Sequence, residues 1–133
     1  MFTGKAPQIF LLVVITTSAL LLVSCGRDVT KGDVYQRISK DIRIGADKSE
    51  VRKYLVPLDI NGVKPTIYDD YRQAQLNFTV AAPGGKSVEV EGMIFATFRN
   101  SRLKLFNFCS SAGVIFYFDE SNKLITYHID CFG

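Results

Sequence analysis

The chain has 133 residues, of which 16 are Lys or Arg and 13 are Asp or Glu, so its formal net charge is +3 at neutral pH. This balance excludes the strongly basic surface that is typical of nucleic-acid-binding proteins, and the basic residues are scattered rather than grouped. With three cysteines and one histidine, the chain also has few residues suited to a metal centre. The sequence therefore predicts no nucleic-acid partner, no metal and no cofactor.

Residues 1–24 are predicted to form a signal peptide. Lys5 is the only charged residue ahead of the apolar run Ile9–Val23, in which Leu, Val and Ile dominate. A basic start, a short apolar stretch and a small-residue end form the secretory signal pattern. A membrane-spanning helix needs about 20 apolar residues, whereas this stretch is shorter and contains two Thr and a Ser at positions 16–18. We therefore expect a cleaved signal rather than a retained transmembrane anchor.

The signal ends in Leu22-Val23-Ser24-Cys25, which resembles the lipobox of bacterial lipoproteins at every position. The resemblance implies that diacylglycerol alkylates the Cys25 sulfur and that the chain is cut before Cys25. Cysteine suits this role because its sulfur is nucleophilic, and two or more acyl chains anchor a protein stably. Gly26, rather than Asp, follows the cysteine. By resemblance to the enterobacterial sorting rule, this favours the outer membrane, with the domain facing the periplasm. The alternative is an ordinary signal peptide that contains a cysteine.

Removal of the signal leaves enough chain for one small domain. Residues 25–33 are polar and contain glycine, so we expect them to form a lipidated tether. Residues 34–133 are then expected to form a single folded domain.

Two short helices are predicted at the start of this domain. Apolar residues recur at helical spacing over residues 33–42, with Asp33 as the expected N-cap. Gly45 then interrupts the helical pattern. Asp47-Lys48-Ser49-Glu50 has the form of a capping box that opens the second helix. Pro57 is expected to end that helix, because the residue before a proline is pushed out of the helical region.

After about residue 65 the pattern changes to the period of two that is typical of strands. Alternating residues 74–80 are followed by a Pro-Gly-Gly turn at residues 82–86. Further strand segments are expected at residues 88–91, 93–98, 103–106, 114–118 and 124–130. The predicted fold class is α+β, with two short N-terminal helices packed on an antiparallel meander of about four to five strands.

Cys109 and Cys131 remain as a pair if Cys25 carries lipid, and an even pair in an exported domain predicts a disulfide. If Phe118 pairs with Leu124 across the last hairpin, Cys131 lies opposite Ser111, within reach of Cys109. Zinc bound by both cysteines and His128 is the alternative.

Two segments resemble the small SmpA/OmlA lipoprotein family. Residues 44–51, IGADKSEV, with Leu55 and Pro57 after them, resemble the family's helix–turn–helix opening. Residues 114–129, VIFYFDESNKLITYHI, resemble its last hairpin. The resemblance implies the fold of the β-lactamase-inhibitor protein, two helices packed on an antiparallel sheet. It also implies an accessory role in an outer-membrane complex, since the family includes a lipoprotein of the β-barrel assembly machine.

No set of residues in the sequence predicts a catalytic site. Asp119-Glu120 is expected in a turn, Ser110-Ser111 has no nearby histidine, and His128 is expected on the solvent side of a strand. We therefore predict that the protein is not an enzyme but a lipid-anchored binding or scaffold module. The alternative is an inhibitor or immunity lipoprotein that blocks a cell-envelope hydrolase. The loops at residues 61–65 and 82–86 are natural candidates for contact with a partner, although the sequence assigns neither loop to one.

Overall fold

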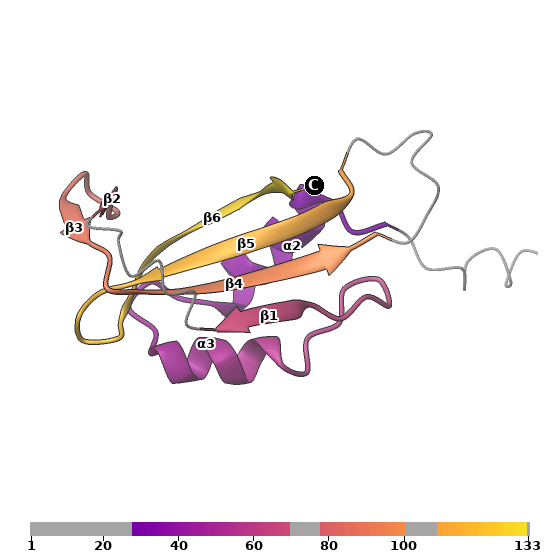
Figure 1. Cartoon of the computed structure of the whole chain (residues 1–133), viewed down its shortest axis with the longest axis horizontal. Helices are drawn as coiled ribbons and strands as arrows, with labels where there is room; N and C mark the ends of the chain where they lie inside the picture. Colours follow the sequence, from indigo (N-terminus) through magenta and orange to yellow (C-terminus); the bar gives the residue numbers. More distant parts are fainter. Residues whose placement is uncertain (1–27, 70–77, 101–108, 133) are drawn as a thin grey trace, which may run out of the picture.

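The computed structural model of the chain describes residues 28–69, 78–100 and 109–132 (Figure 1). In these residues, two helices precede a four-stranded antiparallel sheet and a separate two-stranded sheet, which confirms the α+β class. The helices are α2 (Lys31–Asp41) and α3 (Lys48–Leu55). The strands are β1 (Thr66–Asp69), β2 (Thr79–Ala81), β3 (Ser87–Glu89), β4 (Gly92–Arg99), β5 (Ser111–Phe118) and β6 (Leu124–Phe132).

The strands do not form the single meander that we expected. The four-stranded sheet has the order β1-β4-β5-β6, and β2 and β3 pair only with each other. The prediction missed β1 because its four residues include one inward apolar side chain, Ile67, which is too little for an alternating pattern. The strand residues expected at 74–77 and 103–106 lie outside the described residues.

Helix α2 begins earlier than predicted. Its N-cap is Thr30, whose Oγ1 accepts a hydrogen bond from the Asp33 amide at 3.1 Å, while the Asp33 carboxylate accepts from the Thr30 amide at 3.0 Å. Asp33 is therefore the third residue of a capping box and not the N-cap itself. Val29, just before the cap, is fully buried. The folded domain thus includes residues that we had assigned to the tether.

Helix α3 begins after Asp47, as expected, but without the predicted capping box. The Asp47 side chain makes no cap hydrogen bond, and its Oδ1 lies 2.9 Å from the Lys123 Nζ in the turn after β5. The Gly45 turn is confirmed, with a φ of +89°. Its amide donates to the Leu124 carbonyl at 2.8 Å, so the turn between the helices is connected to the β5–β6 hairpin.

One face of the sheet packs against the helices and forms the core. Alternate residues of β4 and β5 are buried, while α2 and α3 bury their apolar stripes against them. Each such Val, Leu, Ile or Phe side chain contributes about 1.5–3 kcal/mol when it is fully removed from water. The fully buried residues from these four elements are Val34, Ile38, Val51, Leu55, Ile94, Ala96, Phe98, Ala112, Val114, Phe116 and Phe118.

The opposite face of the sheet carries aromatic side chains. The Phe95 ring stacks on Tyr68, with the ring centroids 5.7 Å apart, and meets the edge of Phe132 at 4.9 Å. Gly113 makes room for Phe132, because a Cβ at residue 113 would lie 2.8 Å from its ring. The absence of a side chain at Gly113 therefore lets the Phe132 ring pack against this face of the sheet.

Candidate functional site

The Cys109–Cys131 disulfide, predicted from the sequence, is present. The two Cα atoms are 5.2 Å apart and the sequence separation is 22 residues. The expected pairing of Phe118 with Leu124 is confirmed, but Cys131 lies opposite Ala112 instead of Ser111. The cause is a bulge between Tyr117 and Phe118, which shifts the register by one residue.

The zinc alternative is wrong, because the disulfide uses both of the sulfur atoms that it required. The His128 side chain is exposed, as predicted, and its Nε2 lies 3.5 Å from the Asp130 carboxylate. Within residues 28–69, 78–100 and 109–132, no group of three or more His, Cys, Asp or Glu side chains could hold a metal ion.

The side-chain amide of Asn100 connects the start of the domain to the disulfide. Asn100 Oδ1 accepts from the Val29 amide at 2.8 Å, and Nδ2 donates to the Val29 carbonyl at 3.1 Å and to the Cys109 carbonyl at 3.0 Å. One residue at the end of β4 therefore holds the first buried residue beside the cross-link. These contacts of Asn100 were not predicted, since an Asn after a strand indicates only a turn.

The loop after α3 lies at this same end of the domain. Asn61, in a left-handed conformation with a φ of +54°, donates from Nδ2 to the Asp28 carbonyl at 3.4 Å and to the Asp33 carboxylate at 3.2 Å. We call the region formed by residues 28–30, Asn61, Asn100 and the Cys109–Cys131 disulfide the N-terminal end. Asn61, in the first candidate contact loop, thus binds the segment around the start of α2.

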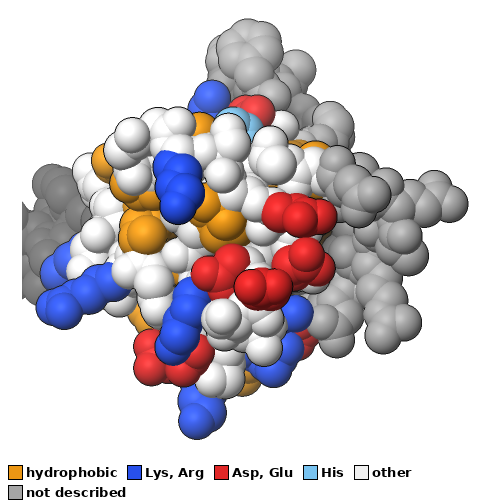
Figure 2. All heavy atoms as spheres, turned by 90° about the vertical axis from the view of Figure 1, so that its left-hand side faces the viewer, with side chains coloured by type: hydrophobic (Ala, Val, Ile, Leu, Met, Phe, Trp, Pro, Cys, Tyr) orange, Lys and Arg blue, Asp and Glu red, His pale blue; other side chains and the backbone are white. Residues whose placement is uncertain are grey.

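The opposite end, which we call the hairpin end, carries the β2–β3 and β5–β6 turns. Figure 2 shows acidic side chains gathered on this end of the molecule. Three exposed glutamates lie here: Glu89 at the end of β3, Glu91 shortly after it, and Glu120 in the β5–β6 turn. The second candidate contact loop, residues 82–86, is confirmed as the β2–β3 turn, with the Ala82 amide donating to the Lys86 carbonyl at 2.8 Å.

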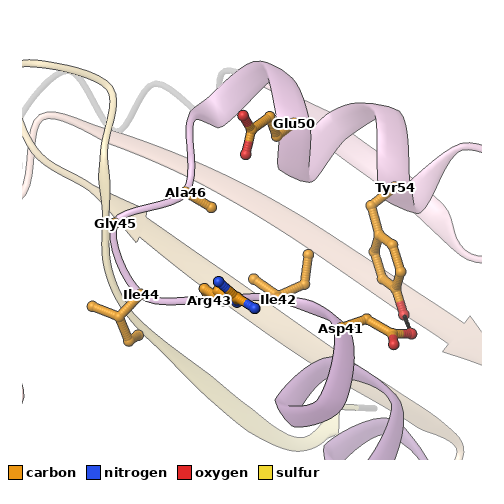
Figure 3. A pocket seen from close by; sticks show the side chains of 8 residues that line it. All are labelled: Asp41, Ile42, Arg43, Ile44, Gly45, Ala46, Glu50 and Tyr54. Carbon is orange, nitrogen blue, oxygen red and sulfur yellow. Dashed lines mark hydrogen bonds between the residues drawn. The ribbon is translucent and has the colours of Figure 1, made fainter.

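A pocket of about 360 Å³ lies between the end of α2, the Gly45 turn and α3 (Figure 3). We call it the α2–α3 pocket. Ile42 and Ala46 supply apolar surface, while Arg43 and Glu50 supply charges of opposite sign. Ile44 lines the pocket although 47% of its surface is exposed. The pocket residues are Asp41, Ile42, Arg43, Ile44, Gly45, Ala46, Glu50 and Tyr54.

Tyr54 closes one side of the pocket through a hydrogen bond. Its hydroxyl donates to the Asp41 carboxylate at 2.6 Å. Partial burial, and then this hydrogen bond and the nearby negative charge, raise the pKa of the Tyr54 hydroxyl well above its usual range. The phenol therefore stays protonated at neutral pH. The pocket lining is therefore suited to a ligand group that has both polar and apolar parts, and the Tyr54 hydroxyl is poorly suited to releasing a proton.

Other polar residues that we weighed as catalytic candidates have structural roles. Asp119 Oδ1 accepts from the Ser121 and Lys123 amides at 2.9 and 3.0 Å, so it shapes the β5–β6 turn as predicted. The Ser110 hydroxyl donates to the Phe132 carbonyl at 3.2 Å. These hydrogen bonds give the Asp119 and Ser110 side chains structural roles.

Comparison with protein-family models, with curated proteins and with solved structures found no match to this chain. The resemblance to the SmpA/OmlA family therefore stays a prediction. Cys25, the predicted lipidation site, lies outside the described residues. In the part of the chain that the structure describes, no helix has the length and apolar character needed to cross a membrane.

Replacement of Cys109 by Ser should destabilise the domain under oxidising conditions. A loop of 22 residues corresponds to about 3 kcal/mol from chain entropy. Thermal unfolding followed by circular dichroism should show a lower melting temperature for Cys109→Ser than for the wild type. With reductant present, the two proteins should melt together. Equal melting without reductant would show that the cross-link does not stabilise the fold.

Tyr54 should make the stability fall at alkaline pH. Because its pKa is raised in the folded state, its stabilising contribution is complete below the unfolded value of about 10 and is lost as the pH rises above it. Urea unfolding at pH 9 and pH 11 should show a smaller loss of unfolding free energy in Tyr54→Phe than in the wild type. Identical losses in the two proteins would contradict the role of this hydroxyl.

Proposed function

We propose that the mature protein is a lipid-anchored component of the bacterial cell envelope that acts as a non-catalytic binding module. In this proposal the lipid on Cys25 holds it in the outer membrane, facing the periplasm. The Cys109–Cys131 disulfide is the observation that carries the proposal. Disulfides persist in oxidising compartments and are rare in the cytosol, so this cross-link supports export.

The number of cysteines supports the lipid anchor. The chain has three cysteines, and the disulfide uses two of them. Cys25 is the third, and it stands at the end of an apolar run in the lipobox pattern. An exported protein gains from having no spare thiol once its disulfide has formed, because a free thiolate can attack that disulfide. Lipidation of Cys25 satisfies this condition.

The character of the α2–α3 pocket supports a binding role. It combines apolar and charged side chains, and its tyrosine is held protonated by burial and by Asp41. Ile44 is an exposed large apolar residue at its rim. Apolar anchors surrounded by polar groups are typical of protein-binding surfaces. We therefore propose a protein partner that inserts a side chain into this pocket, as part of an outer-membrane complex.

Replacement of Cys25 by Ser should abolish lipid attachment. The serine hydroxyl is a far weaker nucleophile than the cysteine sulfur. In cells fed a labelled fatty acid, the wild type should incorporate label, whereas Cys25→Ser should not and should accumulate as a precursor. Normal processing and membrane retention of the variant would overturn the anchor. Cys109→Ser is the matched control, because it removes a cysteine but leaves the lipobox intact.

Crosslinking in cells followed by mass spectrometry should recover a specific envelope protein with the wild type. Ile44→Asp places a charge at the pocket rim and should abolish this recovery. Val56→Asp is the matched control, since Val56 is 65% exposed and does not line the pocket, so the partner should be retained.

Recovery of no specific partner by the wild type would contradict the binding role. Equal recovery of the partner by Ile44→Asp and Val56→Asp would show that the pocket is not the binding site for that partner. If the partner is a hydrolase, a form lacking residues 1–25 should be mixed with it. Stoichiometric loss of hydrolase activity would favour the inhibitor alternative.

A further inference from the structure

The folded domain starts only a few residues after the predicted lipid. Val29 is fully buried, and both of its backbone groups are hydrogen-bonded to the Asn100 side chain. Thr30 then opens the capping box of α2. The described domain is therefore held at Val29, and only residues 26–28 lie between Cys25 and Val29.

This separation limits how far the domain can stand from the membrane. The four residue steps from Cys25 to Val29 span at most about 14 Å, whatever their conformation. A lipid on Cys25 thus holds the Val29 Cα within about 14 Å of the Cα of the cysteine that carries the acyl chains. Asn100 donates hydrogen bonds to both the Val29 and the Cys109 carbonyls, so the N-terminal end stays close to Val29 and therefore to the lipid.

The α2–α3 pocket belongs to the other end of the sheet. Arg99 pairs with Ser111 beside the N-terminal end, whereas Gly92 pairs with Phe118 at the hairpin end. The seven residue steps between Gly92 and Arg99 extend about 24 Å along the strand. Gly45, which lines the pocket, donates its amide to Leu124, the residue opposite Phe118. Figure 1 shows the two ends at opposite sides of the molecule along its longest axis.

We propose that the N-terminal end lies directly on the surface of the lipid bilayer, so that the α2–α3 pocket faces away from the membrane. This inference rests on the proposed lipid anchor and adds an orientation to it. It also restricts the partner, which must approach the domain from the aqueous side, opposite the anchor.

The proposed contact depends on the short tether and requires no attraction to charged lipids. Lys31 at this end lies 3.7 Å from the Asp130 carboxylate, whereas Arg99 carries a second, exposed positive charge there. Phosphatidylcholine vesicles, which carry no net charge, are therefore sufficient to test the orientation.

The absence of tryptophan makes the chain suitable for single-tryptophan probes. Arg99→Trp places a probe at the N-terminal end, and Glu120→Trp places one at the hairpin end, both at exposed positions. Lys31→Trp is a second probe of the N-terminal end, at the first residue of α2. Each lipidated mature variant, which begins at Cys25, is reconstituted into phosphatidylcholine vesicles that contain a lipid with a nitroxide on its headgroup.

We expect the fluorescence of Arg99→Trp and Lys31→Trp to be quenched several-fold more than that of Glu120→Trp. Inserting 20 Gly and Ser residues between Gly26 and Arg27 lengthens the tether to a root-mean-square span of about 25 Å, and should remove the difference. Vesicle flotation is measured first on every sample. Failure of the wild type to float overturns the lipid anchor and this orientation with it. Flotation with equal quenching at the two ends, or a difference that survives the insertion, overturns the orientation alone.

Discussion

The side-chain amide of Asn100 connects three parts of the chain that are distant in sequence: the end of β4, the first buried residue Val29 and the disulfide at Cys109. Three of its four hydrogen-bonding positions are used in a half-buried site. Hydrophobic packing alone would bury Val29 in many orientations. The directional bonds of Asn100 select one, and with it the direction in which the chain enters the domain. The position of the capping box and of α2 depends on that choice.

At the hairpin end, backbone hydrogen bonds fix the chain as the Asn100 side chain does at the N-terminal end. Gly45 donates its amide to the carbonyl of Leu124 at the start of β6, and Lys48 donates its amide to the carbonyl of Asn122 in the β5–β6 turn. The Asp47–Lys123 ion pair adds little to these bonds, because both side chains are exposed to solvent. The turn between the helices is thus fixed to the sheet by its backbone. The α2–α3 pocket is formed by the same turn, so its shape depends mainly on these backbone contacts.

Local patterns in the sequence predicted the parts of the fold that depend on local physics. Val34 and Ile38 are buried because their spacing places them on one helix face, and the Gly45 turn follows from glycine's backbone freedom. The disulfide was predicted from cysteine count and compartment, but its register was wrong by one residue. A bulge at Tyr117/Phe118 depends on packing that alternation does not encode. The Asn100 contacts, 71 residues from Val29, and the α2–α3 pocket depend on tertiary structure alone.

The two ends of the domain therefore have different physical tasks. The N-terminal end combines a covalent cross-link with a hydrogen-bonded side chain, which suits the point where the proposed lipid tether would join the domain. A mobile junction there would let the domain tilt freely about Val29, and each tilt would change the direction of the α2–α3 pocket. Because the bonds of Asn100 fix the chain entry, tilting of the domain about Val29 is restricted. In the proposed orientation, a partner approaching from the aqueous side would meet the pocket within a narrower range of orientations, which lowers the rotational entropy that binding must remove.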